Sequence, residues 1–291
     1  MIEYLRPASV GEAVDLLAAR DGKARVIAGG TDVLPDLRAG RISPTCLVDI
    51  TQVPELGRIE VTEDSVCVGA AVTFAAIKDH PFLVRRVPAL AAAAGSVGAA
   101  AIQNAATWVG NIVQAMPAAD GAVIAVALEA EACLVDARAT VWRPVEALFE
   151  GPGVSAIDPT RQLVTCIRFP LREELWGTAW QRIGRRPSLV LPILNCAVSL
   201  QLDAVGARVT RAVVAMGPVA PCPFRACGAE EELVGRPPTE ETFARAARVA
   251  CHEAQPRSST FRASCDYRLS VIPHLITTAL SVAAGRARSA A

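Results

Sequence analysis

Two short segments of this chain carry the residue types that bind phosphate groups. The first, residues 26–33, reads VIAGGTDV and places two glycines and a hydroxyl directly after an apolar run. Adjacent glycines let backbone N–H groups converge on an anion without hindrance from a Cβ, and Thr31 can donate a further hydrogen bond. Because a Gly-Gly pair also forms ordinary turns, this segment alone is a weak indication of a phosphate site.

The second segment, residues 107–120, reads TWVGNIVQAMPAAD and again combines a hydroxyl, a glycine and a side-chain amide. Asp120 ends it with a carboxylate that could accept a hydrogen bond from a ribose hydroxyl, and the small residues leave room for a flat ring system. The alternative is that Asn111 and Asp120 only cap turns. Two such loops in one domain support a dinucleotide site more than either loop does alone, and the turn-capping alternative stays open.

Strands and helices must position these loops. Ser9-Val-Gly-Glu12 has the form of a capping box and predicts a short first helix. Apolar runs bounded by turn residues predict strands, and they alternate with helical patterns up to about Pro170. The elements expected are strands at 25–28, 46–50 and 65–69 and a helix at 88–94.

Beyond Pro170 the pattern changes to a hairpin followed by helices. Residues 194–203 and 207–216 read as two strands joined at a glycine turn. Thr239 precedes two acidic residues and predicts a helix start, and a last helix is expected at about 267–284. We therefore expect an α+β protein with a domain boundary near residue 175 and a smaller C-terminal α+β domain at 176–291.

Composition narrows the class of protein. The 29 basic and 29 acidic residues balance, so the net charge does not favour nucleic acid as a partner. The nine cysteines are scattered without a CxxC pair and the three histidines lie far apart, so neither a metal site nor a His-centred triad is expected. No apolar run reaches membrane-spanning length, and unpaired thiols suit a reducing compartment. We expect a cytoplasmic protein.

Four stretches of the chain resemble one family. Residues 28–38 (AGGTDVLPDLR) and 101–134, together with 168–200 and the tail PRSSTFRASCDYRL at 256–269, are similar to the FAD-binding subunit of molybdenum hydroxylases. This family includes xanthine dehydrogenase and aerobic carbon monoxide dehydrogenase. The resemblance extends over essentially the whole chain.

The resemblance implies a PCMH-type FAD-binding fold in residues 1–175, with two α/β subdomains at about 1–55 and 56–175. It implies FAD held without a covalent bond, because neither loop contains His or Cys. The implied cofactor contacts are Val26, Ile27, Ala28, Gly29, Gly30, Thr31, Asp32 and Val33, then Thr107, Val109, Gly110 and Asn111, and finally Asp120, Val164 and Gln181.

The resemblance also implies partners. A molybdopterin-binding large subunit would oxidise the substrate, and a small subunit would carry electrons through [2Fe-2S] clusters to this chain, in a heterotrimer or its dimer. FAD would then pass the electrons to NAD+, a quinone or oxygen, and no catalytic residue is expected here. The tail pattern PRSS-x-x-RAS favours the purine (xanthine) type, while carbon monoxide, aldehyde and N-heterocycle dehydrogenases stay open, as does a stand-alone flavin oxidase.

Three positions depart from the family pattern. Val109 replaces a glycine before Gly110, Gln181 replaces a frequent lysine, and Leu189 replaces an aspartate. A cation near the flavin stabilises its anionic reduced form. We expect Arg182 or Arg185 to supply that cation in place of the lysine.

Overall fold

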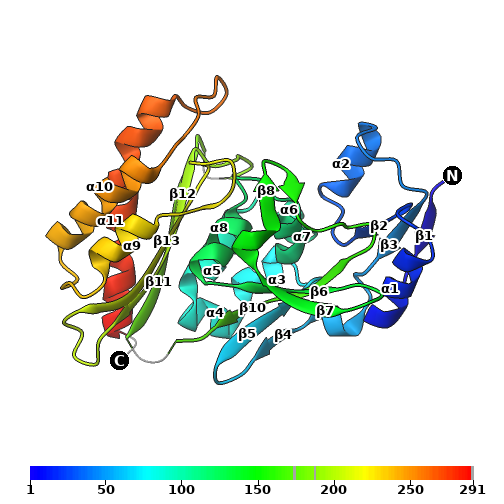
Figure 1. Cartoon of the computed structure of the whole chain (residues 1–291), viewed down its shortest axis with the longest axis horizontal. Helices are drawn as coiled ribbons and strands as arrows, with labels where there is room; N and C mark the ends of the chain where they lie inside the picture. Colours follow the sequence, from blue (N-terminus) through cyan, green and yellow to red (C-terminus); the bar gives the residue numbers. More distant parts are fainter. Residues whose placement is uncertain (173–174, 187, 290–291) are drawn as a thin grey trace.

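The computed structural model describes residues 1–172, 175–186 and 188–289. Figure 1 shows three parts along the long axis: a small sheet near the N-terminus, a central sheet with short helices, and a C-terminal sheet covered on one side by long helices. The protein is α+β, as expected.

The N-terminal sheet is parallel, with strand order β1-β3-β2. The predicted capping residue Ser9 accepts a hydrogen bond from the Glu12 backbone N–H at 3.1 Å, and the Glu12 carboxylate accepts one from the Ala8 N–H at 2.7 Å. The helix therefore starts where the sequence indicates. The elements are β1 (Glu3–Leu5), α1 (Val10–Ala18), β2 (Ala24–Ile27), α2 (Val33–Arg38) and β3 (Cys46–Asp49).

The central part is an antiparallel sheet of order β4-β5-β10-β6-β7 with helices on one face. Every residue of α8 is buried, because this helix is apolar on all sides and lies between two sheets. The elements are η1 (Pro54–Gly57), β4 (Ile59–Val61), β5 (Ser65–Gly69), α3 (Phe74–Asp79), α4 (Pro81–Arg86), α5 (Pro88–Ser96), α6 (Ala100–Gln103), α7 (Trp108–Val113), α8 (Asp120–Ala127), β6 (Glu131–Val135), β7 (Thr140–Pro144), η2 (Val145–Leu148), β8 (Phe149–Gly151), β9 (Val154–Ser155) and β10 (Leu163–Pro170).

The C-terminal sheet is antiparallel, of order β11-β12-β13-β14. One face packs closely on α11, since a Cβ on Gly177 would lie 1.9 Å from the Ala283 carbonyl oxygen. The last helix is longer than predicted and ends at Ser289, because Ala287 is fully buried in this contact. The elements are β11 (Trp176–Ile183), β12 (Leu194–Leu202), β13 (Val209–Gly217), β14 (Phe224–Arg225), α9 (Cys227–Leu233), α10 (Glu240–Glu253) and α11 (Cys265–Ser289).

The other face of the C-terminal sheet packs on helices α5 and α8. Successive side chains of a strand point to opposite faces, so Trp176 and Trp180 of β11 join the core of the N-terminal part. Ala179 and Ile183 of the same strand join the core under α11. The boundary expected near residue 175 falls between β10 and β11 and stays a prediction.

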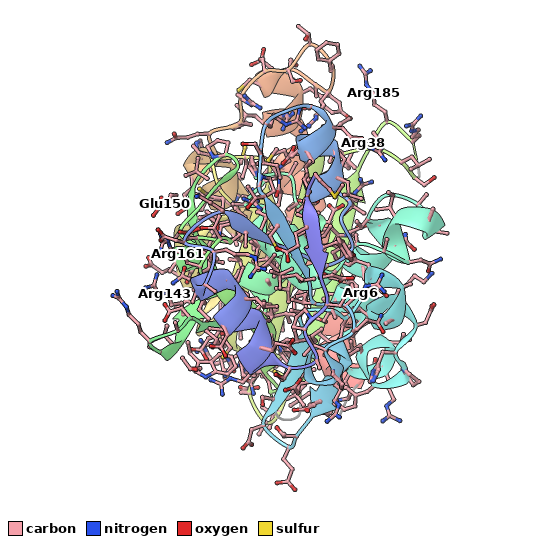
Figure 2. The ribbon with its side chains drawn as sticks, turned by 90° about the vertical axis from the view of Figure 1, so that its right-hand side faces the viewer. Arg6, Arg38, Arg143, Glu150, Arg161 and Arg185 are labelled. Carbon is pink, nitrogen blue, oxygen red and sulfur yellow. The ribbon has the colours of Figure 1, made fainter. Side chains whose placement is uncertain are left out.

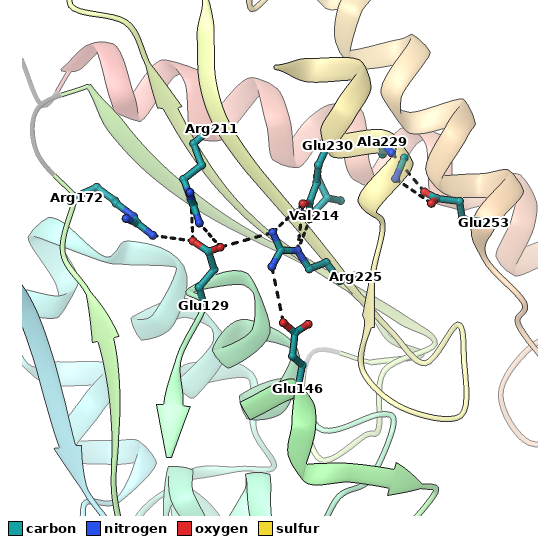
Figure 3. A network of polar contacts seen from close by, with 10 residues as sticks. Glu129, Glu146, Arg172, Arg211, Val214, Arg225, Ala229, Glu230 and Glu253 are labelled. Atoms are coloured by element: carbon teal, nitrogen blue, oxygen red, sulfur yellow. Dashed lines mark hydrogen bonds and ion pairs between the residues drawn. The ribbon is translucent and has the colours of Figure 1, made fainter. Parts of the chain in front are cut away.

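A cluster of charged side chains also joins the two parts (Figure 3). Glu129 follows α8 and forms ion pairs with Arg172 at 2.7 Å and with Arg211 and Arg225 of the C-terminal sheet. Arg225 bonds Glu230 in turn at 2.9 Å. We call Glu129, Arg172, Arg211 and Arg225 the Glu129 cluster.

Candidate functional site

The two predicted loops both line one cavity of about 340 Å³. It opens between the small N-terminal sheet, helices α6 and α7, and strand β10. Twelve of the residues expected to contact the cofactor line it: Val26, Ala28, Gly29, Gly30, Thr31, Asp32, Val33, Thr107, Val109, Gly110, Asn111 and Val164.

The first loop has no room for larger residues at its glycines. A Cβ on Gly29 would lie 1.8 Å from the Ala105 carbonyl oxygen, so the chain two residues before the second loop lies directly against the first loop. Gly30 has φ +68°, a left-handed conformation that favours glycine. Gly29 therefore allows the two segments to approach closely, and Gly30 allows the turn of the first loop.

The first loop also presents free backbone donors to the cavity. Across the described ranges, no protein acceptor is bonded to the backbone N–H of residues 29–33, whereas the Leu34 N–H already bonds the Gly30 carbonyl at 3.0 Å. Successive N–H groups in a glycine turn form a concave donor set that suits phosphate oxygens. The pKa of the neighbouring Asp32 is raised by desolvation and by Asp36, although the Thr31 hydroxyl lowers it.

The second loop is held rigid by its own polar side chains. The buried Thr107 caps α7, where its hydroxyl accepts from the Gly110 N–H at 3.1 Å. The Asn111 amide oxygen accepts from the Gly121 N–H at 3.0 Å and so fixes α7 to α8. Both side chains bond backbone N–H groups and also line the cavity.

Arg25 is a charged cavity residue that the sequence-based reasoning missed. It lines the cavity beside the first loop, its Nε is buried without a hydrogen-bond partner among the described residues, and burial lowers its pKa. A buried guanidinium nitrogen without a partner is costly unless a ligand supplies an acceptor. The signal available in the sequence was a single charged residue inside the apolar strand 24–27.

Three of the expected contacts do not line the cavity. Ile27 is buried beneath the first loop, where its side chain would contact any Cβ added to Gly30. Gln181 alternates with Arg182 along β11 and lies on the face that packs on α11. Asp120, at the start of α8, is only 5% exposed and faces the C-terminal sheet.

Asp120 bonds two residues of that sheet. Arg182 Nε lies 3.3 Å from one carboxylate oxygen, and Asn195 Nδ2 donates to the other at 2.6 Å. Burial raises the pKa of Asp120 to about 6, although Arg182 and Asn195 oppose the shift. We call Asp120, Arg182 and Asn195 the Asp120 site.

Comparison with known families identifies the family of the chain. Residues 1–172 match the family model described as the FAD binding domain in molybdopterin dehydrogenase. The chain belongs to this family of FAD-binding subunits. Residues 179–283 match the CO dehydrogenase flavoprotein C-terminal domain, which accounts for the C-terminal sheet and helices.

Individual relatives match most of the length of the subunit. It is 31% identical over 285 residues to the putative xanthine dehydrogenase FAD-binding subunit of Escherichia coli (strain K12), covering 98% of this chain and 96% of the relative. It is 30% identical to the nicotinate dehydrogenase FAD-subunit of Eubacterium barkeri, covering 83% and 82%. The carbon monoxide dehydrogenase structure from Hydrogenophaga pseudoflava matches with a TM-score of 0.90 at 28% identity, covering 98% of both chains.

This chain is therefore an oxidoreductase component, the FAD subunit of a molybdenum hydroxylase of the xanthine and carbon monoxide dehydrogenase type. None of the helices in the described ranges has the length and apolarity needed to cross a membrane. In the same ranges, no group of three or more His, Cys, Asp or Glu side chains is arranged to hold a metal ion.

The structure shows the surroundings of the positions at which the FAD subunit departs from the family pattern. Val109 is 4% exposed and forms part of the cavity wall. Leu189 is exposed with φ +53°, and its N–H bonds the Gly98 carbonyl, which brings Leu191 to the cavity rim. Of the two arginines expected to replace the lysine, Arg182 bonds Asp120, while Arg185 is exposed and projects away from the body of the molecule (Figure 2).

Proposed function

We propose that this subunit binds one FAD in the cavity between residues 26–33 and 107–111, and that the FAD diphosphate lies against the N–H groups of residues 29–33. The observation that carries the proposal is that two kinds of donor line the same cavity. Among the described residues, neither these backbone N–H groups nor the Nε of Arg25 has a hydrogen-bond acceptor. Backbone donors and a cation together satisfy a diphosphate. When bound, FAD accepts electrons singly from one-electron donors and passes them on in pairs.

The protein residues have binding and shaping roles in this proposal. Gly29 and Gly30 let the backbone approach the diphosphate, and Arg25 compensates its charge. The apolar side chains of Val109, Val164 and Leu191 exclude water from the ring. Asp120 and Gln181 contribute only indirectly, since neither lines the cavity.

Arg25 offers the test. Loss of one charge-assisted hydrogen bond costs about 1.5–3 kcal/mol, so Arg25→Met should weaken FAD binding at least about tenfold. Arg38→Met is the matched control, because Arg38 of α2 is exposed at the surface (Figure 2). The measurement is quenching of flavin fluorescence on titration of FAD with each protein. Equal affinities for all three proteins would contradict the proposed diphosphate position.

We further propose that FAD is held without a covalent bond. Among the residues that the structure describes, no His or Cys lines the cavity, and these are the side chains that attach flavin in the wider fold. Acid precipitation should release all the flavin into the supernatant. Flavin that stays on the precipitated protein would overturn this part of the proposal.

For the complex, we propose a heterotrimer, or its dimer, with a molybdopterin-binding large subunit and a [2Fe-2S] small subunit, in the cytoplasm. Electrons would pass from the clusters to FAD and then to NAD+ or another acceptor. The xanthine type is favoured by the tail at 256–264 and by the E. coli relative. Relatives named for nicotinate and carbon monoxide support the alternatives.

Assays on the complex purified from its host would distinguish the xanthine type from the alternatives. Reduction of acceptor is measured with xanthine, nicotinate, an aldehyde and carbon monoxide, each with NAD+ and with a quinone. Turnover of xanthine with NAD+ is expected. Turnover of another substrate alone would move the assignment to that type, and turnover by the isolated FAD subunit would indicate a stand-alone oxidase.

A further inference from the structure

Three cysteines of the central sheet lie on neighbouring strands and on one face. Cys166 of β10 is directly opposite Cys133 of β6 and Gly69 of β5, and Cys67 of β5 is opposite Arg168. Their neighbours Val66, Val68 and Ile167 point to the opposite face and are fully buried in the core. The three thiols therefore lie on the other face of the sheet, where η1 and the start of α1 line a groove beside Cys67 and Cys166.

No β5 side chain lies directly opposite Cys166, because that position is Gly69, where the Leu56 backbone would contact any Cβ. Because Gly69 has no side chain, Cys67 is the nearest β5 side chain to Cys166 on this face. Both cysteines line a groove of about 320 Å³ and are half-buried, whereas Cys133 is 7% exposed and does not line it. A small reagent can thus reach Cys67 and Cys166 but not Cys133.

The surroundings make the two thiols unequal. A hydrogen bond with the Cys166 side chain lowers the pKa of Cys67, and Arg168 also lowers it, while burial and Glu60 on β4 oppose this shift. The same bond, burial and the nearby Cys133 raise the pKa of Cys166. A thiolate that is accessible and adjacent to a second thiol is the arrangement found in redox-reactive cysteines.

We propose that Cys67 and Cys166 form a peroxide-reactive thiol pair, in which Cys67 is the nucleophile and Cys166 resolves its oxidised form. The Cys67 thiolate attacks hydrogen peroxide, the O–O bond breaks, and Cys67 becomes a sulfenic acid with loss of hydroxide, which is protonated to water. The Cys166 sulfur then attacks the Cys67 sulfur, a second water leaves, and a disulfide joins β5 to β10. Peroxide takes up the two electrons.

Wild-type protein tests the first step without any substitution. The full-length chain is alkylated with a brief pulse of iodoacetamide at pH 7.5, and labelled tryptic peptides are quantified. Cys67 should react about tenfold faster than Cys227, because a thiolate is the reacting form and the pKa of Cys227 is raised by burial and by Glu230. Cys227 is the more exposed of the two, so faster labelling of Cys227 would overturn the proposal.

Peroxide treatment tests the second step. Cys67 and Cys166 lie in separate tryptic peptides, 59–78 and 162–168, so their disulfide gives a unique cross-linked mass. It is expected in wild type and in the Cys133→Ser control. In Cys166→Ser, the Cys67 sulfenic acid should accumulate and be trapped by dimedone, and in Cys67→Ser, Cys166 should stay reduced. A Cys133–Cys166 disulfide, or none at all, would contradict the pair.

Discussion

Two carboxylates bind arginines across the same boundary between the N-terminal part and the C-terminal sheet, yet their pKa values shift in opposite directions. Glu129 is half-buried among three arginines, and although burial opposes it, their combined effect lowers its pKa. Asp120 is nearly fully buried with one arginine, and burial raises its pKa to about 6. The number of cations and the access of water decide whether an ion pair recovers its desolvation cost.

Loss of Arg182 should have the largest effect. Arg182→Met leaves the Asp120 carboxylate buried without its cation, which typically costs about 3–5 kcal/mol. The loss of unfolding free energy should be smaller at pH 5 than at pH 8, because Asp120 is largely protonated at pH 5. Urea unfolding at both pH values measures it, with Arg185→Met as the exposed control. Equal losses at the two pH values would mean that Asp120 is not the group left unpaired.

Loss of the Glu129 charge should have a smaller effect. Glu129→Gln keeps the shape but removes charge-assisted hydrogen bonds to Arg172 and Arg211, so we expect a loss of about 2 kcal/mol in the free energy of unfolding. Glu131→Gln is the matched control, because Glu131 pairs only with Arg168 and both side chains are about 40% exposed. The control should lose under about 1 kcal/mol. A larger loss of unfolding free energy in Glu131→Gln than in Glu129→Gln would contradict this prediction.

The contributions of Asp120 and Glu129 to stability should change in opposite directions as pH rises. Asp120 has a folded pKa above its unfolded value, so the folded state holds the extra proton between about pH 4 and 6 and stability falls as pH rises through that window. Glu129 has a lowered pKa, so its contribution is present above the unfolded pKa of about 4.5 and is lost as pH falls.

The measurement is the unfolding free energy of wild type minus that of Asp120→Asn, and separately minus that of Glu129→Gln, from pH 3 to pH 8. The first difference should fall with rising pH and the second should rise. A first difference that rises with pH would show that burial does not dominate the pKa shift of Asp120.

Salt should have the smallest effect. Raising ionic strength from 0.1 M to 1 M shortens the Debye length from about 10 Å to about 3 Å and weakens exposed pairs selectively. The cost of Glu129→Gln should therefore shrink by under about 1 kcal/mol, because half of the Arg211 side chain is exposed. The cost of Arg182→Met should stay constant, since its side chain is 9% exposed. An equal response of both variants would show that water reaches both sites.

Much of the fold was predictable because its signals are local. Ser9 and Thr239 cap the helices that follow them, and the strand at 65–69 is found at those residues. The end of the last helix was not predictable, because Ala287 belongs to it only through its burial against the C-terminal sheet. Contacts between distant segments override local indications.

The same distinction applies to the candidate site. Residues 26–33 and 107–111 are contiguous, so each loop could be identified as a unit, and the structure brings both to one cavity. Leu191 and Gly98 reach that cavity through long-range packing that no short pattern encodes. Alternation along β11 puts Gln181 and Arg182 on opposite faces, but similarity alone could not show that one face packs on α11 and the other meets Asp120.

The two tryptophans of β11 have an optical consequence. Trp176 and Trp180 belong to the C-terminal sheet but pack in the core of the N-terminal part. They are two of only four indoles in the chain. Separation of the two parts would expose them to water and shift their emission to longer wavelength, while bound flavin would absorb part of that emission. The protein thus carries its own fluorescent reporter of how its halves fit together.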